Sequence, residues 1–225
     1  MDEKKIAAEY SVNYIEDGMV VGLGTGSTVS LMLVKLSERI KTGLKITAVS
    51  TSQATTKLAV SLGIRITKLN EVDEIDLTID GADEVDEKLN GIKGGGGALL
   101  QEKIVASNSK KNIWIVDSSK LVKTLGSFPL PVEVAQFGCE QLCVKLKNNG
   151  LQPSLRMKNG KKFITDNNNY IVDLKLGVIP DPVALDIKLK SFPGVIETGL
   201  FYRIADEVIV GAGNGVKIFS KKKRV

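Results

Sequence analysis

The fold is indicated first by residues 19–28, which read MVVGLGTGST. Met19 to Leu23 is a short apolar run typical of a buried strand, and a turn of glycines and small hydroxyl residues follows it directly. After the turn, the apolar residues from Val29 to Ile40 recur with the spacing of an amphipathic helix. A buried strand, a glycine-rich turn and a helix in this order predict the start of a parallel α/β sheet.

The alternation of strand and helix continues along the first half of the chain. We expect further strands at 45–49, 64–66, 75–79 and 113–116, and helices at 2–16, 53–62 and from about residue 98. Such strands pair in parallel with helices on both faces, and ligands bind beyond their carboxyl ends. The sequence therefore predicts a Rossmann-like domain whose site lies in the loops that follow its strands.

A second, smaller domain is predicted after Pro129 and Pro131. Strands are expected at 132–135, 154–157 and 195–198, two more at 163–165 and 170–174 around a polar turn, and helices at 139–147 and from Asp181. This order is typical of a ferredoxin-like, split βαβ unit. We therefore expect an α+β domain at 129–201, inserted into a catalytic α/β domain of 1–128 and 202–225. Residues 207–211 and 216–219 would return to the first domain as a hairpin.

The composition excludes several classes of chemistry. The 225 residues include no histidine, which rules out a Ser-His-Asp triad, a histidine-ligated metal and an imidazole base. The two cysteines, Cys139 and Cys143, are too few for a zinc site, and we expect reduced thiols in or beside a core. Proton transfer must therefore use Asp, Glu, Lys, Tyr or Cys.

The charge and hydropathy patterns bear on location and partners. The net charge is +5, but Lys221–Arg224 contributes four of the 31 basic residues, and the other 27 nearly balance the 26 acidic ones. A near-neutral body argues against nucleic-acid binding. The basic tail is either a targeting or nucleic-acid patch or a solvated terminus, and we expect the terminus. With no long apolar run and a charged start, the sequence predicts a cytoplasmic chain that does not bind a membrane.

The turn at Gly24–Thr28 has the features of a phosphate site. Free backbone N–H groups and the dipole of the following helix favour an anion there. A dinucleotide fingerprint would need glycine where Ser27 stands and an acid where Ser50 stands, and the lysine of a Walker loop is missing. The turn is therefore interpreted as a cradle for one phosphate, the alternative being a tight turn without a ligand.

The second candidate loop is acidic and directly follows an apolar strand. Asp80 and Asp83 stand at the exit of that strand, where an active site would form. Glu84 and Asp86 are expected to be solvated. A calcium loop is excluded because the glutamate required by EF-hand spacing is missing. Carboxylates beside a sugar can accept hydrogen bonds from its hydroxyls and move protons.

The third candidate loop is Lys93–Gly97, followed by Glu102 in the first turns of a helix. Four consecutive glycines carry a high entropic cost, so we expect a loop folded tightly around a ligand; the alternative is a flexible linker. Glu102 would be a general base and Lys93 a source of positive charge. Together with a phosphate cradle, this set meets the needs of aldose–ketose isomerisation through an enediolate.

These loops resemble those of type A ribose-5-phosphate isomerases. The resemblance rests on GTGST at 24–28, DGADE at 80–84, KGGG at 93–96 with Glu102, FPLPVEV at 128–134 and PGV at 193–195. It extends from the first helix to about Lys217. It implies an enzyme of the non-oxidative pentose phosphate pathway that interconverts D-ribose 5-phosphate and D-ribulose 5-phosphate without metal or other cofactor, as a homodimer or tetramer.

The resemblance also implies roles for particular residues. Glu102 would accept the proton, Asp80 would assist opening of the furanose ring, Lys93 would stabilise the enediolate, and Asp83 completes the catalytic set. The substrate-binding residues would be Lys4, Thr25, Gly26, Ser27, Thr28, Asp80, Gly81, Ala82, Asp83, Lys93, Gly94, Gly95, Gly96 and Lys120.

Three other functions remain as alternatives to the isomerase. The first is a non-catalytic sugar-phosphate sensor, which would have no need of Glu102 and Lys93 together. The second is an amino-sugar phosphate deaminase, which would be expected to use a histidine. The third is an acyl-CoA transferase, which would need a longer chain.

Overall fold

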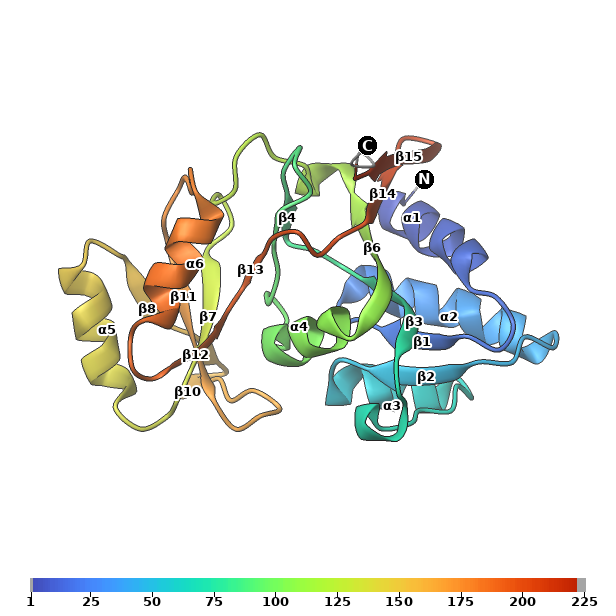
Figure 1. Cartoon of the computed structure of the whole chain (residues 1–225), viewed down its shortest axis with the longest axis horizontal. Helices are drawn as coiled ribbons and strands as arrows, with labels where there is room; N and C mark the ends of the chain where they lie inside the picture. The colour runs from blue at the N-terminus through green and yellow to red at the C-terminus, as the bar shows by residue number, and fades with distance from the viewer. Residues whose placement is uncertain (1, 222–225) are drawn as a thin grey trace. The chain divides into compact units, whose positions relative to one another are not determined.

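The computed structural model describes residues 2–221, and the chain divides into two compact units (Figure 1). Of the described residues, 2–82, 101–121 and 203–221 form the first unit, and 83–100 and 122–202 form the second. The first unit is discontinuous in sequence, as expected for a domain that carries an insertion. Of the basic tail, Lys222–Arg224 lies outside the described residues, whereas the Nζ of Lys221 donates to the carboxylate of Asp206 at 3.1 Å.

The first unit contains a six-stranded sheet in the order β15-β14-β6-β3-β1-β2. Its strands are β1 Val20–Leu23, β2 Thr47–Ser50, β3 Ile75–Asp80, β6 Ser109–Asp117, β14 Glu207–Ala212 and β15 Gly215–Ser220. All neighbours pair in parallel except β15, which forms the predicted hairpin with β14. The strand expected at 64–66 is wrong: the segment makes only a single bridge, between Ile66 and Ala48, and otherwise connects helix and strand.

Helices cover both faces of this sheet. They are α1 Glu3–Ser11, continued by a 3₁₀ turn at Val12–Tyr14, α2 Ser27–Lys41, α3 Gln53–Ser61 and α4 Leu99–Ser107. Side chains alternate along β1, so Val21 and Leu23 pack in the core formed with α1 and α2, whereas Val20 packs with Val105 of α4. This arrangement confirms the predicted parallel sheet layered between helices.

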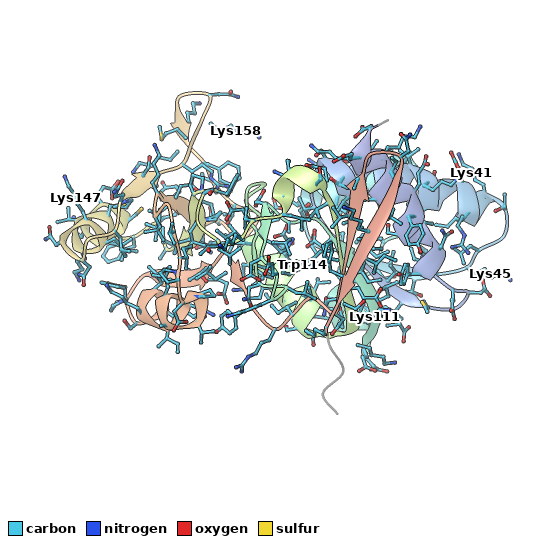
Figure 2. The ribbon with its side chains drawn as sticks, turned by 90° about the horizontal axis from the view of Figure 1, so that it is seen from above. Lys41, Lys45, Lys111, Trp114, Lys147 and Lys158 are labelled. Atoms are coloured by element: carbon cyan, nitrogen blue, oxygen red, sulfur yellow. The ribbon has the colours of Figure 1, made fainter. Side chains whose placement is uncertain are left out.

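Burial separates interior and surface side chains as expected. Trp114 of β6 is 2% exposed and lies inside the first unit, whereas the labelled Lys41, Lys147 and Lys158 project from the surface (Figure 2). Among residues 2–221, no helix is both long enough and apolar enough to cross a lipid bilayer.

The second unit has a four-stranded antiparallel sheet in the order β12-β7-β11-β8. Its strands are β7 Leu130–Val134, β8 Pro153–Leu155, β11 Tyr170–Leu174 and β12 Val195–Thr198, with α5 Cys139–Asn148 and α6 Pro182–Lys190 in the connections and a short hairpin of β9 Met157–Lys158 and β10 Lys161–Lys162. The chain order β7-α5-β8-β11-α6-β12 is the predicted split βαβ arrangement. The strand expected at 163–165 is wrong, because the segment makes only the bridge between Ile164 and Tyr170.

A three-stranded sheet, β13-β5-β4, places the loops after β3 in the second unit. It consists of β4 Glu84–Val85, β5 Gly91–Ile92 and β13 Leu200–Phe201. The N–H of Lys93 donates to the carbonyl of Gly199 at 2.9 Å, and the N–H of Val122 donates to that of Val85 at 2.9 Å. The compact units therefore differ from the predicted domain ranges at 83–100, at 122–128 and at residue 202, because main-chain pairing over long sequence separations is not visible in a local pattern.

Candidate active site

The glycine turn after β1 lies against the end of β3. A Cβ atom on Gly24 would stand 2.0 Å from Oδ1 of Asp80 and 2.5 Å from its Cα, so only glycine fits there. Gly26, with a φ of 124°, precedes the first residue of α2. The first N–H groups of this 15-residue helix and its dipole therefore lie at the turn, where an anion is favoured.

Asp80 joins the turn to the sheet. Its side chain is 2% exposed, and Oδ1 accepts the N–H groups of Thr25 at 2.9 Å and Gly81 at 2.7 Å. Leu23 is in register with Ile79, so β1 and β3 end together. The structure thus brings two of the predicted loops together within the first unit.

The hydroxyl of Thr25 belongs to a cluster that the sequence interpretation missed. Its Oγ1 lies 2.8 Å from Oγ1 of Thr51, 2.9 Å from Oγ of Ser52 and 3.2 Å from Oγ1 of Thr55. Thr55 also donates to the carbonyl of Gly24 at 2.7 Å. The sequence signal was present, since STSQATT at 50–56 follows a predicted strand and therefore lies at the same edge of the sheet.

Lys4 and Lys120, two of the predicted substrate-binding lysines, belong to segments joined by Glu3. Nζ of Lys4 lies 3.3 Å from Oγ of Ser27. The carboxylate of Glu3 accepts hydrogen bonds from the N–H of Ser118 at 3.0 Å, its hydroxyl at 2.6 Å and the N–H of Gly213 at 2.9 Å. These bonds, that of the Ser118 hydroxyl first, lower the pKa of Glu3 from 4.5 to about 2. Ser118 begins the 3₁₀ turn Ser118–Lys120, so Glu3 links the start of α1 to the segment that carries Lys120.

In the second unit, Asp83 contacts the glycine loop. The N–H of Gly95 donates to Oδ2 of Asp83 at 2.8 Å, and a Cβ on Gly95 would stand 2.6 Å from Oδ1. Lys93 is 3% exposed, and its Nζ lies 5.4 Å from the centroid of the Phe201 ring, within cation–π range. A buried lysine at the start of this loop fits the predicted cationic role.

The four glycines form a packed loop, so the linker interpretation is wrong. Gly94 and Gly97 have φ values of 99° and 80°, which residues with a Cβ atom rarely adopt. A Cβ on Gly94 would stand 2.8 Å from the side chain of Leu99, and one on Gly97 would stand 2.4 Å from the ring of Phe163. Glycine is therefore required by close contact as well as by backbone conformation.

Glu102 lies in the first turn of α4 and is only 3% exposed. Carboxylates with so little exposure are frequent at functional sites, and the role of Glu102 as a general base stays a prediction. Of the predicted site residues, the first unit contains Lys4, Thr25–Thr28, Asp80–Ala82, Glu102 and Lys120. Asp83 and Lys93–Gly96 belong to the second unit.

Comparison with known proteins identifies the family. The family model described as ribose 5-phosphate isomerase A (phosphoriboisomerase A) matches residues 47–215. A ribose-5-phosphate isomerase A of Streptococcus thermophilus (strain CNRZ 1066) is 52% identical over 225 residues, which cover 99% of this chain and 100% of the relative. The chain belongs to the ribose 5-phosphate isomerase A family. A Streptococcus pneumoniae (strain R6) protein of the same name is 52% identical over 98% of this chain and 97% of its own length.

Solved structures of ribose 5-phosphate isomerases share the fold of this family member. One, a D-ribose-5-phosphate isomerase in complex with phospho-erythronic acid, matches with a TM-score of 0.94 and 43% identity over 98% of this chain and 100% of that chain. The enzyme of Plasmodium falciparum matches with a TM-score of 0.94 and 40% identity over 98% of each chain.

Two acidic residues of this chain differ from expectation. Glu84 is 3% exposed rather than solvated, because its carboxylate accepts the N–H groups of Gly126 at 2.7 Å and Phe128 at 2.6 Å. Asp86 is half-buried and accepts the N–H groups of Lys88 and Asn90 within its own turn. Both carboxylates accept hydrogen bonds from backbone N–H groups. The sequence does not show whether an acidic side chain makes such bonds or is solvated.

The remaining predictions concern metals and thiols. Within the described part of the chain, no group of three or more Cys, Asp or Glu side chains could hold a metal ion. Cys139 is buried in the core of the second unit and Cys143 packs beside it, and both are free thiols, as expected. Burial raises the pKa of Cys139 to about 11.

Proposed function

We propose that this chain interconverts D-ribose 5-phosphate and D-ribulose 5-phosphate, in the non-oxidative pentose phosphate pathway. Membership of the ribose 5-phosphate isomerase A family over nearly the whole chain supports the reaction. The observation in the molecule itself that carries the proposal is Glu102, a carboxylate 3% exposed at the start of the helix that follows the glycine loop.

In the proposed mechanism, the substrate is bound by its two ends. The phosphate is held by Thr25–Thr28 at the start of α2, with Lys4 supplying positive charge, and Lys120 also contacts the substrate. The sugar end is held by Asp80–Asp83 and Lys93–Gly96. The support is the hydrogen bonding of Asp80 to the phosphate turn in one unit and of Asp83 to the glycine loop in the other.

The proposed chemistry moves one proton between neighbouring carbons. Asp80 assists opening of the furanose ring, and Glu102 then removes the proton from C2 of the aldose to give an enediolate. Lys93 stabilises the negative charge on the oxygen. Glu102 returns the proton to C1, while the hydroxyl proton passes from O2 to O1, so the aldehyde becomes an alcohol and C2 becomes the ketone. The sum of the steps is an isomerisation with no net gain or loss of protons or electrons.

We propose a reaction without metal or other cofactor, a cytoplasmic location, and a homodimer or tetramer that binds neither nucleic acid nor membrane. The partner is the sugar phosphate itself.

The decisive experiment is a coupled assay with ribose 5-phosphate in excess EDTA. The parent chain should turn over, and Glu102→Gln should lower kcat by at least about 10²-fold with little change in substrate binding, because the amide cannot accept the proton. Glu87→Gln, at an exposed position, is the matched control and should be unaffected. Near-parent turnover in Glu102→Gln would remove Glu102 from its role. Binding without turnover in the parent would favour a sugar-phosphate sensor instead.

A further inference from the structure

Arg156 connects the sheet of the second unit to the glycine loop. Its Nε donates to Oδ2 of Asp173 at 2.9 Å, and its Nη2 contacts the other carboxylate oxygen. Its Nη1 donates to the carbonyl of Gly94 at 2.8 Å and to that of Gly95 at 3.1 Å. The Arg156 and Asp173 side chains are 15% and 21% exposed. One planar cation thus joins a carboxylate to two successive carbonyls.

We propose that Arg156, oriented by Asp173, is a positioning residue for the isomerisation and acts by fixing the backbone of the glycine loop. The inference rests on the proposed function and deepens it, since Arg156 itself is assigned no contact with the substrate. Its effect passes through Gly94 and Gly95, the two residues directly after Lys93.

The geometry of the peptide between Gly94 and Gly95 supports this role. In a trans peptide the C=O and N–H groups point in opposite directions, and the described residues contain no cis peptide bond. The oxygen of this peptide is held by Arg156, and its N–H is held by Asp83 at 2.8 Å. The plane is therefore fixed at both ends, by a cation on one side and by a proposed site carboxylate on the other.

The next peptide is held from the same side. Because Arg156 also binds the carbonyl of Gly95, the N–H of Gly96 is directed away from the guanidinium. The ring of Phe163, 5.9 Å from the Cζ of Arg156, contacts the loop at Gly97, where a Cβ would stand 2.4 Å from it. Arg156 and Phe163 together limit the conformations open to the loop.

A glycine loop has particular need of such a clamp. Glycine has the widest choice of backbone conformations, so four in succession leave the loop poorly defined by local sterics. The fork of donors on arginine can pair with a carboxylate and still reach two carbonyls, whereas the ammonium of lysine cannot match this planar geometry. The identity of the side chain at position 156, and not its charge alone, should therefore matter.

The test is steady-state kinetics with ribose 5-phosphate on Arg156→Ala and Arg156→Lys in the full chain. A misplaced loop should lower kcat by about 10- to 100-fold in both variants. KM should rise by a smaller factor than kcat falls, because the phosphate turn is untouched although the loop also holds the sugar end. Guanidinium ion at about 50 mM should restore part of kcat in Arg156→Ala, and NaCl at the same ionic strength should not. Lys162→Ala, which removes an exposed ion pair with Glu140 in the same unit, is the control and should leave kcat unchanged.

Each other outcome overturns the inference. These are a kcat within about twofold of the parent in both variants, a loss confined to KM, or a loss that guanidinium relieves no better than NaCl. If Arg156→Ala does not fold, Asp173→Asn tests the same point, because it keeps the shape but weakens the orientation of the guanidinium. Its kcat should fall about three- to tenfold, and an unchanged kcat would again overturn the inference. An inactive parent would reject the proposed function as well, whereas an active parent with unaffected variants would reject only the role of Arg156.

Discussion

Replacing Glu84 by alanine should destabilise the chain strongly although the residue has no proposed role in catalysis. Glu84 lies in β4, and its two carboxylate oxygens accept the N–H groups of Gly126 and Phe128. These bonds attach the strand that follows Asp83 to the loop before β7, 42 and 44 residues further along the chain. The alanine variant leaves both donors without this acceptor.

The magnitude follows from the burial of the two donors. Gly126 is buried, and loss of a charge-assisted hydrogen bond there should cost about 2–3 kcal/mol. Phe128 is half-buried, so water can reach its N–H in part and the cost should be about 1–2 kcal/mol. The expected loss in the free energy of unfolding is therefore about 3–5 kcal/mol. Glu84→Gln should lose about half of this, because its amide oxygen can still accept one of the two bonds.

Urea denaturation followed by far-ultraviolet circular dichroism measures the change. Glu87→Ala is the control, since this glutamate three residues away is exposed and should change stability by no more than about 0.5 kcal/mol. A loss below about 1 kcal/mol in Glu84→Ala would mean that the two hydrogen bonds do not hold the loop, and the reasoning would be refuted.

Three further predictions concern the glycine turn, the start of α1 and the thiols. Gly24→Ala should lower both stability and kcat/KM, because its Cβ would stand 2.0 Å from the carboxylate of Asp80. Gly215→Ala is the control, since a Cβ there would meet open space. Equal behaviour of the two variants in thermal melts and assays would contradict the close contact. Glu3 has a pKa lowered to about 2 from 4.5, so its contribution to stability is present above pH 4.5 and is lost as the pH falls towards 2. The stability difference between the parent and Glu3→Gln in urea titrations should shrink over that range, and a constant difference would show that the carboxylate is not held. The thiol of Cys139 has a pKa of about 11, so about 0.1% of it should be thiolate at pH 8. It should therefore react with a disulfide reagent far more slowly in the folded chain than in urea. Equal rates would mean that the thiol is exposed at the surface.

The periodic parts of the sequence predicted most of the fold. The strand, turn and helix at 19–40 and the hairpin at 207–219 follow from local patterns of apolar residues, and both occur as expected. The start of α6 was equally local, since Asp181 caps the helix with its side chain and Pro182 occupies the first position. The strands expected at 64–66 and 163–165 failed because short apolar runs carry no information about whether a partner strand lies alongside.

The candidate site was predicted only in part. The order of the loops placed Thr25, Asp80, Asp83 and Lys93 at strand ends or in a ligand loop, because the carboxyl ends of parallel strands share one edge of a sheet. The hydrogen bonds of Asp80 to the glycine turn and of Asp83 to Gly95 agree with that placement. The roles of these residues in catalysis stay predictions until variants are assayed.

By itself, the sequence determined the alternation of strands and helices, the absence of histidine chemistry and the three loops with unusual composition, because each is a property of neighbouring residues. Only the tertiary structure decided which distant groups hold those loops in place. Arg156 is 62 residues from Gly94, Glu3 is 115 from Ser118, and Glu84 is 42 from Gly126. A hydrogen bond needs its donor and acceptor within about 3 Å of each other in space, and the sheets and turns that bring such groups together are built from contacts that no local pattern contains.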